Sequence, residues 1–217
     1  MLRLIPEVPS RRPLRLLCIG AHSDDLEIGC GGTVLTWLAS MRAVEVTWVV
    51  LGAEGGRATE ARGSARALLR RAAAHKVVIA DFRDGFLPAQ YADVKSFFED
   101  LKGEVDPDVV LTHWLQDRHQ DHRLAAELTW NTWRNHLVLE YEIAKYEGDL
   151  GLPNAYVPIP ASLARRKVSH LGRYFHSQRS KDWFVADNFL ALMRIRGMEC
   201  RAASGFAEAF HMRKFVF

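Results

Sequence analysis

The stretch LRLLCIGAHSDDLEIGCGG, residues 14–32, combines the two features that indicate the fold. It begins with an almost wholly apolar run of strand length, and a cluster of polar side chains follows at once. A strand this apolar has no face left for water, so the run is typical of a parallel sheet covered on both sides. The polar cluster then lies beyond the carboxyl end of the strand, where open parallel sheets bind their ligands.

Segments of the same kind recur along the chain, with helical patterns between them. Further short, mostly apolar strands are expected at 44–51, 76–82, 108–114 and 137–143. Helices are expected at 32–41, 59–75, 91–103, 122–136, 162–175 and 181–199. The alternation of strand and helix predicts an α/β fold with a Rossmann-like, doubly wound and mostly parallel sheet, with helices on both faces.

The composition is that of a globular protein, with 48% hydrophobic and 25% charged residues among 217. No repeat or linker divides the chain, so we expect one domain over 1–217 that begins with a surface arm at 1–13. No apolar run approaches about 18 residues, which argues against stable membrane insertion. The arm contains three prolines and three arginines and lacks the apolar core of a secretory signal.

The net charge and the cysteine pattern limit which partners and which cellular compartment are expected for the protein. A net charge of +3 is too small to indicate a nucleic-acid-binding protein. The three cysteines show no CxxC spacing, so a disulfide framework or a cysteine-based zinc site is not expected. We therefore expect a cytoplasmic protein that acts on a small molecule. The sequence leaves open whether the protein forms a homo-oligomer.

Two polar segments follow strands of the predicted sheet and contain most of the chemistry. They are AHSDDLEIGCGG (21–32) and HWLQDRHQDH (113–122). Imidazole nitrogens and carboxylate oxygens are ligands of catalytic zinc, which usually has three protein ligands and one open position for water. A histidine and an aspartate from one loop with a histidine from the other would supply this set. Without a cation, buried carboxylates would repel one another, so the pair of segments predicts a divalent metal site.

Each segment taken alone has a simpler explanation. The glycines of GCGG let the backbone turn sharply and approach a ligand, and they could cradle a phosphate, although GxGxxG spacing is absent. HQDH could be the polar start of a helix, with Asp121 favoured by the helix dipole. HSDD could be an ordinary polar loop. Their joint occurrence after two strands of one sheet favours a shared site.

Together the motifs resemble those of the LmbE-like, or PIG-L, family of zinc-dependent N-acetylglucosaminyl deacetylases. The family's AHPDD and GxGG elements correspond to AHSDDLEIGCGG, and its HxDH element corresponds to residues 119–122. FHSQ at 175–178 and SGFAEAF at 204–210 extend the likeness over nearly the whole chain. Ser23 replaces the usual proline and Leu26 a frequent glutamate, but neither change removes a ligand. The resemblance implies hydrolysis of the acetamide of an N-acetylated sugar.

The resemblance also implies roles for individual residues. The positions that match the metal ligands are His22, Asp25 and His122. Zn²⁺ is the expected ion, and Fe²⁺ or Co²⁺ are alternatives. Asp24 matches the general base, protonated His119 matches the group that holds the oxyanion, and Asp121 would orient or charge His119. His113 and Asp117 lie near the metal loop and could support a ligand by hydrogen bonding, although ordinary loop polarity explains them equally well.

Several residues on the rim are candidates for contacts with the substrate, though ordinary structural roles explain them equally well. They are Arg62, Asp84, Trp114, Gln178 and Glu208. Two other functions remain open, a non-catalytic module that binds zinc or a sugar and a Rossmann nucleotide-binding transferase. The first would need no general base, and the second would need its glycines without an intervening HxDD element.

Overall fold

The computed structural model describes residues 12–214 and residue 216. The arm predicted at 1–13 lies outside the described residues except for its last two, Arg12 and Pro13. A guanidinium nitrogen of Arg12 lies 2.6 Å from the carboxylate of Asp108, and this ion pair ties the chain down just before the first strand.

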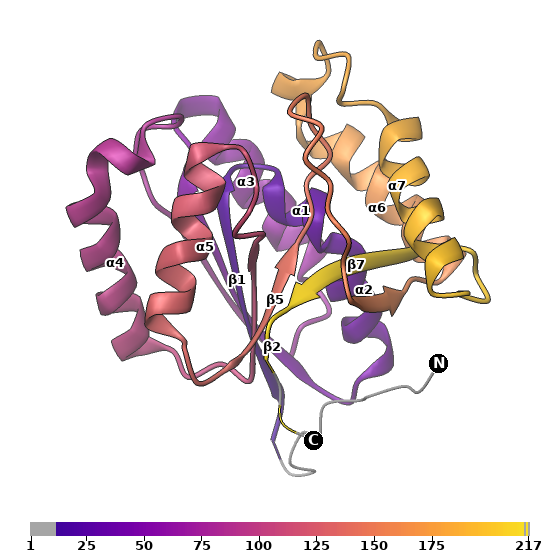
Figure 1. Ribbon diagram of the computed structural model, residues 1–217, viewed down its shortest axis with the longest axis horizontal. Coiled ribbons are helices and arrows are strands. Elements are labelled where there is room, and N and C mark those ends of the chain that lie inside the picture. Colours follow the sequence, from indigo (N-terminus) through magenta and orange to yellow (C-terminus); the bar gives the residue numbers. More distant parts are fainter. Residues whose placement is uncertain (1–11, 215, 217) are drawn as a thin grey trace.

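A seven-stranded sheet forms the centre of the molecule (Figure 1). In chain order, its strands are β1 (Leu14–His22), β2 (Val44–Gly52), β3 (Ala74–Ile79), β4 (Val109–His113), β5 (Leu137–Tyr141), β6 (Ala155–Pro158) and β7 (Ala207–Met212). Their order in space is β3-β2-β1-β4-β5-β7-β6. The first five in this order are parallel, and β7 runs antiparallel to both of its neighbours. The predicted mostly parallel, Rossmann-like sheet is confirmed.

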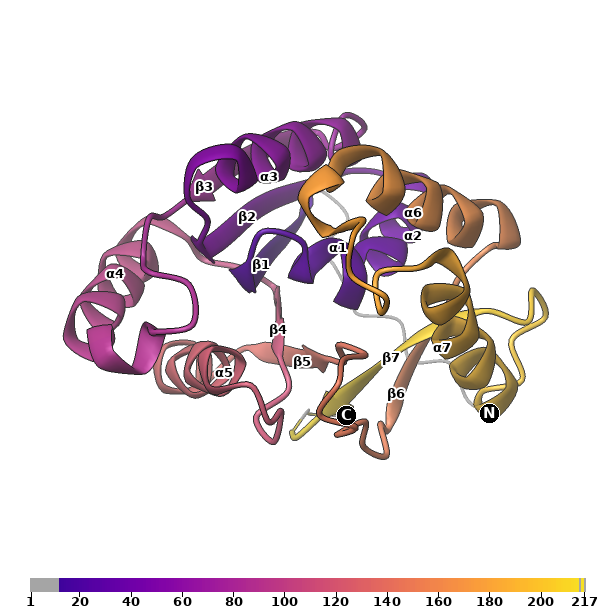
Figure 2. The same cartoon turned by 90° about the horizontal axis from the view of Figure 1, so that it is seen from above.

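Helices cover both faces of the sheet (Figure 2). One face carries α4 (Tyr91–Glu104) and α5 (Gln120–Thr132). The other carries α1 (Asp25–Gly29), α2 (Gly31–Ser40), α3 (Gly55–Leu68), α6 (Ala161–Tyr174) and α7 (Ala186–Glu199). Two short 3-10 turns are η1 (Leu87–Gln90) and η2 (His176–Gln178). Among the described residues, no helix combines the length and the apolar character that crossing a membrane requires.

Strand β1 shows why the apolar runs form this layered core. Leu16 and Cys18 belong to the apolar cluster under α2, α3, α6 and α7, whereas Leu17 and Ile19 belong to the cluster under α4 and α5. Alternate side chains of a strand point to opposite faces, and here both faces are covered. All four side chains are therefore buried, as the continuous run predicts.

The boundaries of several elements differ from the prediction. Helix α3 spans Gly55–Leu68 rather than 59–75. Its first two residues are glycines, which have a low helix propensity, so the sequence did not indicate a helix there. Strand β3 consequently begins at Ala74, and α7 begins at Ala186 rather than at 181. Strands β6 and β7 were not expected, because their pairing joins segments about 50 residues apart.

The strand order places the two motifs side by side. The chain leaves β1 toward β2 and leaves β4 toward β5, while β1 and β4 are themselves neighbours. The connections thus diverge at this point, and a crevice forms beyond the carboxyl ends of the two strands. Both polar segments enter this crevice.

Candidate metal centre

Three side chains from the two motifs meet beyond the ends of β1 and β4. His22 is the last residue of β1, Asp25 is the first of α1, and His122 lies in the first turn of α5. All three are buried, with at most 7% of any one exposed. Asp25 opens a short helix, where the sequence suggested a loop. Its carboxylate oxygen Oδ2 accepts the backbone N–H of His22 at 2.6 Å, which locks the turn.

The donor atoms of these residues form a compact triangle. His22 Nδ1 lies 3.1 Å from His122 Nε2 and 3.2 Å from Asp25 Oδ2. The third side, from His122 Nε2 to Asp25 Oδ2, measures 3.5 Å. Ligands about 2.0–2.1 Å from a tetrahedral ion lie about 3.3 Å from one another. The triangle therefore has the size of one face of a tetrahedral metal site, and the predicted ligands fit a divalent ion.

The remaining nitrogen of each imidazole faces a carboxylate. His22 Nε2 lies 3.2 Å from Asp121 Oδ2, and His122 Nδ1 lies 3.0 Å from Asp117 Oδ2. An N–H donated to these carboxylates leaves His22 Nδ1 and His122 Nε2 unprotonated. Metal-binding histidines are usually held by such a partner. Burial raises the pKa of Asp117, but the hydrogen bond from His122, the charges of His122 and His113 and the hydrogen bond from Lys145 together outweigh it, so the net pKa is lowered and the carboxylate stays charged.

A third imidazole packs against this centre from the sheet. His113, the last residue of β4, stacks on His122 with ring centroids 3.9 Å apart. Its Nε2 accepts the backbone N–H of Ala21 at 2.9 Å. Because that lone pair is used, His113 holds β1 against β4 and supports the His122 ring. This agrees with the supporting role expected for it.

Asp24 lies beside the triangle and does not belong to it. Its side chain is 4% exposed, and its Oδ2 atom is buried without a hydrogen-bond partner in the described structure. Burial, and then the charge of Asp25, raise the pKa of Asp24 to about 6. A spare carboxylate of this kind can accept a proton from a water molecule held at the centre.

His119 caps α5 from the other side of the site. Its Nδ1 accepts the backbone N–H of Asp121 at 3.3 Å, so the proton of the neutral ring lies on Nε2. A ring nitrogen of His119 lies within 4.8 Å of nitrogens of His22 and His122. Burial, and then the two neighbouring imidazoles, lower the pKa of His119. This environment favours a neutral ring with an Nε2–H donor over the protonated His119 that the resemblance implies.

Asp121 has a different partner from the one predicted. Its carboxylate accepts the backbone N–H groups of Gly85 at 2.7 Å and Leu87 at 3.1 Å, and it faces His22 Nε2. The expectation that it orients His119 is thus not met by the described hydrogen bonds, although its charge does act to raise the pKa of His119. Asp121 orients His22, which comes from the other motif.

On the rim above β2 and β3, the structure brings Asp84 to the site but not Arg62. Asp84 Oδ1 lies 3.2 Å from His22 Nε2, and the hydrogen bond from His22 contributes most to lowering the pKa of Asp84 to about 2. Arg62 is exposed on α3, and no described contact joins it to these residues. The arginine at the rim is Arg57, which pairs with Asp84, donates to Ser23 Oγ at 3.2 Å and lies 3.9 Å from Asp24 Oδ1.

Sequence reasoning missed Arg57 because it placed the start of the helix at 59. Arg57 is the first cation after β2, and it occupies the first turn of α3. Its distance from the end of the strand was the signal that could have identified it, since the carboxyl ends of the strands line the site.

Two other predicted substrate contacts lie elsewhere in the described structure. Trp114 stacks on His211, with ring centroids 4.3 Å apart, and packs against Gly151. Gln178 is buried in η2 and donates its side-chain N–H to Ser177 Oγ at 3.0 Å. No described contact joins either residue to the metal triangle. Packing explains both positions.

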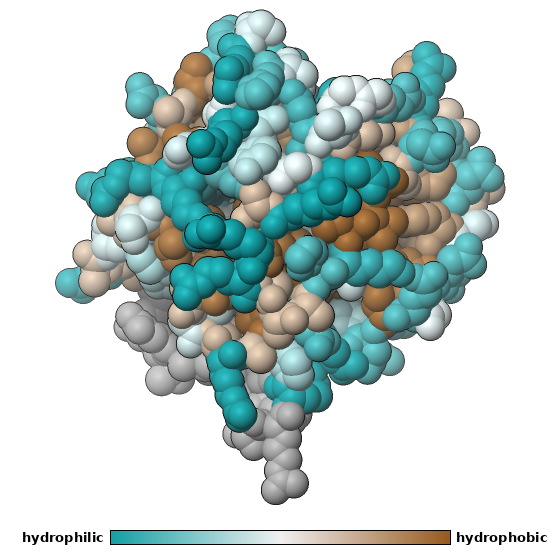
Figure 3. Space-filling view, turned by 180° about the vertical axis from the view of Figure 1, so that it is seen from behind, coloured by the Kyte–Doolittle hydropathy of each residue, from teal (hydrophilic) through white to brown (hydrophobic). Residues whose placement is uncertain are grey.

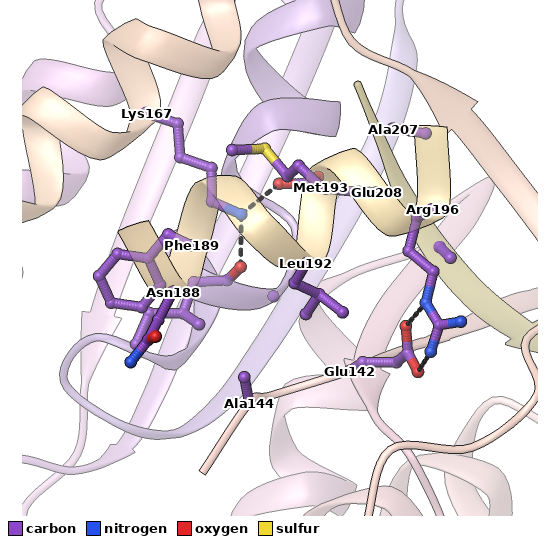
Figure 4. A pocket seen from close by; sticks show the side chains of 13 residues that line it. Glu142, Ala144, Lys167, Asn188, Phe189, Leu192, Met193, Arg196, Ala207 and Glu208 are labelled. Carbon is purple, nitrogen blue, oxygen red and sulfur yellow. Dashed lines mark hydrogen bonds and ion pairs between the residues drawn. The ribbon is translucent and has the colours of Figure 1, made fainter. Parts of the chain in front are cut away.

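Glu208 has a structural role that replaces the predicted contact with substrate. Its buried carboxylate accepts the backbone N–H groups of Gly32 at 2.8 Å and Thr33 at 2.6 Å, at the start of α2. It also binds Lys167 Nζ at 2.6 Å (Figure 4). A side chain at Gly32 would lie 2.8 Å from this carboxylate, so a glycine is required there.

The glycine run therefore serves packing and does not cradle a ligand. A Cβ atom on Gly29 would lie 2.1 Å from the ring of Tyr141, which fills that position. The amides at the start of α2 could otherwise bind an anion, but the carboxylate of Glu208 already holds them. A phosphate has no place at this turn, which argues against the nucleotide-binding alternative.

The sequence matches known proteins over the part that builds this site. The model of the PIG-L family, described as GlcNAc-PI de-N-acetylase, matches residues 17–133, which is more than half of the chain. The uncharacterized deacetylase YaiS of Escherichia coli (strain K12) is 36% identical over 118 residues. That match covers 49% of this chain and 61% of YaiS, so it spans less than two thirds of the relative.

Solved structures share the fold over nearly the whole chain. The 4-carboxy-2-hydroxymuconate hydratase GalB of Pseudomonas putida KT2440 gives a TM-score of 0.71 at 19% identity, over 94% of this chain and 98% of GalB. The N,N′-diacetylchitobiose deacetylase of Pyrococcus horikoshii gives 0.64 at 22% identity, over 92% and 83%. At these identities the likeness shows the fold alone. The family match, together with the two motifs at the ends of β1 and β4, shows that this chain belongs to the PIG-L family.

Proposed function

We propose that this protein is a zinc-dependent deacetylase that hydrolyses the acetamide of an N-acetylated sugar and releases acetate and a free amine. The observation that carries the proposal is the triangle formed by His22 Nδ1, Asp25 Oδ2 and His122 Nε2, with sides of 3.1–3.5 Å. A spare, buried carboxylate lies next to it on Asp24. Two imidazoles and one carboxylate around an open fourth position are a donor set typical of hydrolytic zinc sites.

The residues around the triangle would divide the reaction between them. A bound divalent ion would acidify a water molecule and polarise the acetamide carbonyl. Asp24 then accepts a proton from the attacking water through its Oδ2 atom, which has no hydrogen-bond partner among the described residues. His119 donates its Nε2–H to the oxygen on which negative charge develops, a contribution of about 3–4 kcal/mol for a well-placed donor. Asp24 then returns the proton to the departing nitrogen.

The rim residues support a sugar as the substrate. Arg57 and Asp84 form an ion pair whose members also contact Ser23 and His22. A cation and a carboxylate fixed at the mouth of a site can hold hydroxyl groups of a sugar in one orientation. In this role Arg57 replaces Arg62.

The alternatives are less well supported. A non-catalytic zinc or sugar module has no use for a buried carboxylate oxygen without a hydrogen-bond partner, such as Asp24 Oδ2, because burying such an atom lowers stability. A nucleotide-binding transferase would need the helix terminus that Glu208 occupies. The similar structures include both a hydratase and a deacetylase, so the proposal rests on the residues of the site and not on the fold.

Partners and location stay predictions. A small N-acetylated sugar is the expected partner, without nucleic acid, and the cytoplasm is the expected location. A homo-oligomer also stays a prediction. The face seen in Figure 3 is largely hydrophilic but carries an apolar area to the right of its centre.

The test combines metal removal with a product assay. The purified protein is stripped with a chelator, and acetate release is measured with N-acetylglucosamine, N,N′-diacetylchitobiose and an N-acetylated amino acid. We expect acetate from the sugars after Zn²⁺ is restored and none from the stripped protein. Fe²⁺ and Co²⁺ are tested in parallel to identify the metal. A fully metal-loaded protein that releases no acetate from any N-acetylated sugar would overturn the proposal.

A further inference from the structure

Two stretches of the chain contain many basic residues and no acidic one. Residues 61–80 include four arginines and one lysine, and residues 150–181 include four arginines and two lysines. Neither stretch contains an aspartate or a glutamate. These basic residues far exceed the net charge of the whole chain, which is +3, so the remaining residues are acidic on balance. The positive charge of the protein is therefore concentrated in these two stretches.

The fold brings the two stretches together. They supply most of α3 and all of α6, and these helices lie side by side on the outside of the molecule (Figure 2). Ser64 Oγ on α3 lies 2.8 Å from His170 Nε2 on α6. At one end of the pair, Glu60 accepts the backbone N–H of Ser177 at 2.9 Å and its hydroxyl at 2.6 Å. The order of these contacts shows that α3 and α6 run antiparallel.

Arginines follow the seam between the two helices. Arg62, Arg66 and Arg70 repeat every four residues along α3 and just beyond its end, a spacing that places side chains on one face of a helix. Arg166 and Arg173 are seven residues apart, or about two turns, on α6. All of the arginines along the seam are exposed except Arg166, which is half-buried. We call the following six residues the arginine face: Arg62, Arg66, Arg70, Arg71, Arg166 and Arg173.

The positive charges of the arginine face lie close to one another and have no counter-charge. Burial, and then the charges of Arg70 and Arg71, lower the pKa of Arg166. Burial, then the charge of Arg166 and, less strongly, that of Arg173 lower the pKa of His170 to about 4. Among the described residues, no carboxylate forms an ion pair or a hydrogen bond with this face. Like charges held together in this way repel one another, and an anionic partner would remove the repulsion.

Helix stability explains only part of this arrangement. Arg66 lies in the last turn of α3 and Arg173 in the last turn of α6, where a cation is favoured by the helix dipole. Arg62, in contrast, lies in the middle of α3, and Arg166 lies in the N-terminal half of α6. The dipole does not favour a cation at these two positions, so binding of an anion is the better explanation for the whole face.

The shape and the residue type indicate an extended surface that carries phosphate groups. Each helix has 14 residues and is therefore about 21 Å long, so the pair presents a broad side to a partner. The planar guanidinium group of arginine matches the geometry of phosphate oxygens. Clusters of about four to eight basic residues on one side of a helix are typical of proteins that bind anionic lipids. The surface of an anionic bilayer fits both features.

Other anionic or polymeric partners fit less well. Single-stranded nucleic acid needs aromatic rings on which its bases can stack. Tyr174, the aromatic residue beside the face, is half-buried and packs on the ring of His170 with centroids 4.5 Å apart. A second copy of the chain would bring the same positive face, and the two faces would repel each other.

We propose that the arginine face binds the surface of an anionic phospholipid bilayer, through the phosphate groups and without insertion of a helix. The face begins at Arg62, more than one turn along α3 from Arg57 at the mouth of the metal centre. The bilayer would therefore lie along the side of the molecule. This binding needs neither a metal ion nor turnover, so it can be tested independently of the proposed deacetylation.

The test measures sedimentation of the purified protein with lipid vesicles. One set of vesicles is made of phosphatidylcholine alone, and the other contains phosphatidylglycerol in addition. We expect binding to the second set only. We also expect this binding to be lost when the salt is raised from about 0.1 M to about 1 M, because the Debye length falls from about 10 Å to about 3 Å.

Two triple variants locate the binding surface. The first combines Arg66→Gln, Arg70→Gln and Arg173→Gln. Each basic residue near an anionic surface contributes roughly fivefold to the partition coefficient, so we expect the first variant to lose at least about tenfold. The second is the matched control with the same change in net charge at exposed positions elsewhere, and it should bind like the wild type. It combines Arg134→Gln, Arg194→Gln and Arg213→Gln.

Thermal unfolding is measured on both variants, and we expect melting temperatures near that of the wild type because all the replaced side chains are exposed. Equal loss of binding in the two variants would show that net charge, rather than the arginine face, is responsible, and it would overturn the proposal. Absence of binding to the anionic vesicles would also overturn it. So would tighter binding to duplex DNA or single-stranded RNA than to these vesicles in the same buffer.

Discussion

His22 Nδ1 lies 3.1 Å from His122 Nε2, although one hundred residues separate the two histidines in the chain. A carboxylate orients each imidazole through a hydrogen bond to its other ring nitrogen. Asp121 has this role for His22, and Asp117 has it for His122. When each ring donates its other N–H to its carboxylate, both of the nitrogens that face each other are unprotonated. Two lone pairs directed at one point repel each other, and a cation bound between them removes this repulsion.

Replacement of His122 by alanine should remove the metal together with the activity. The variant loses one of three protein ligands at a site with one open position, so affinity for Zn²⁺ falls steeply. Metal content after gel filtration, measured by mass spectrometry, checks this. His75→Ala, at an exposed position of β3, serves as the control and should keep wild-type metal content. Full zinc occupancy in His122→Ala would show that the ligand is misassigned.

Replacement of Asp24 by asparagine should abolish turnover and spare the metal. The carboxylate touches no donor atom of the triangle in the described contacts, and loss of a general base typically costs about 10²–10⁴-fold in rate. Acetate release and zinc content are measured on the same preparation. Retained turnover in Asp24→Asn would remove this residue as the base.

Replacement of Asp117 by asparagine should weaken metal binding without removing it. Loss of the carboxylate that orients a ligating histidine typically costs about 10–100-fold in metal affinity. Competition with a chromophoric chelator measures this loss directly. Asp149→Asn is the matched control, because Asp149 shares Lys145 with Asp117 but faces no imidazole in the described contacts. Equal losses in both variants would argue that Lys145, rather than the bond to His122, is responsible.

Replacement of Arg57 and of Arg62, both on α3, should have different effects on kcat/KM. Arg57→Ala should lower kcat/KM about 10–100-fold, mainly through KM, because a charge-assisted hydrogen bond contributes about 1.5–3 kcal/mol. Arg62→Ala changes the same residue type on the same helix and should stay within twofold of wild type. The opposite ranking would restore Arg62 as the residue at the rim.

His170 should contribute a loss of stability on mild acidification. Burial, and then the charge of Arg166, lower the pKa of His170 to about 4 from an ordinary 6.5. Between these pH values the unfolded chain binds a proton at this histidine and the folded chain does not. The contribution of His170 to the free energy of unfolding therefore drops as the pH falls below about 6.5, and the drop levels off near pH 4. Urea denaturation of metal-free protein across this range should show that the free energy of unfolding of His170→Gln, relative to that of wild type, rises as the pH falls; a difference that does not change with pH would contradict this.

Much of the fold, and the expectation of a shared metal site, followed from local patterns. A continuous apolar run such as 14–21 implies two covered faces, because a half-exposed strand would alternate. Histidine and aspartate after two such strands imply a shared cation, because parallel strands end at one edge. These inferences use residue type and spacing, both of which the sequence contains. The local pattern did not predict β6 and β7, because these two strands pair with each other although about 50 residues separate them in the sequence.

The tertiary structure decided which groups meet. Glu208, a substrate contact by resemblance, holds the start of α2 together with Lys167, and Asp121 turns His22 rather than His119. Arg57 took the position expected of Arg62, because the register of α3 shifted with its glycine start. Which nitrogen of an imidazole stays free, and which carboxylate stays without a partner, depends on contacts between distant segments. Such contacts arise only when the sheet closes and the helices pack on it.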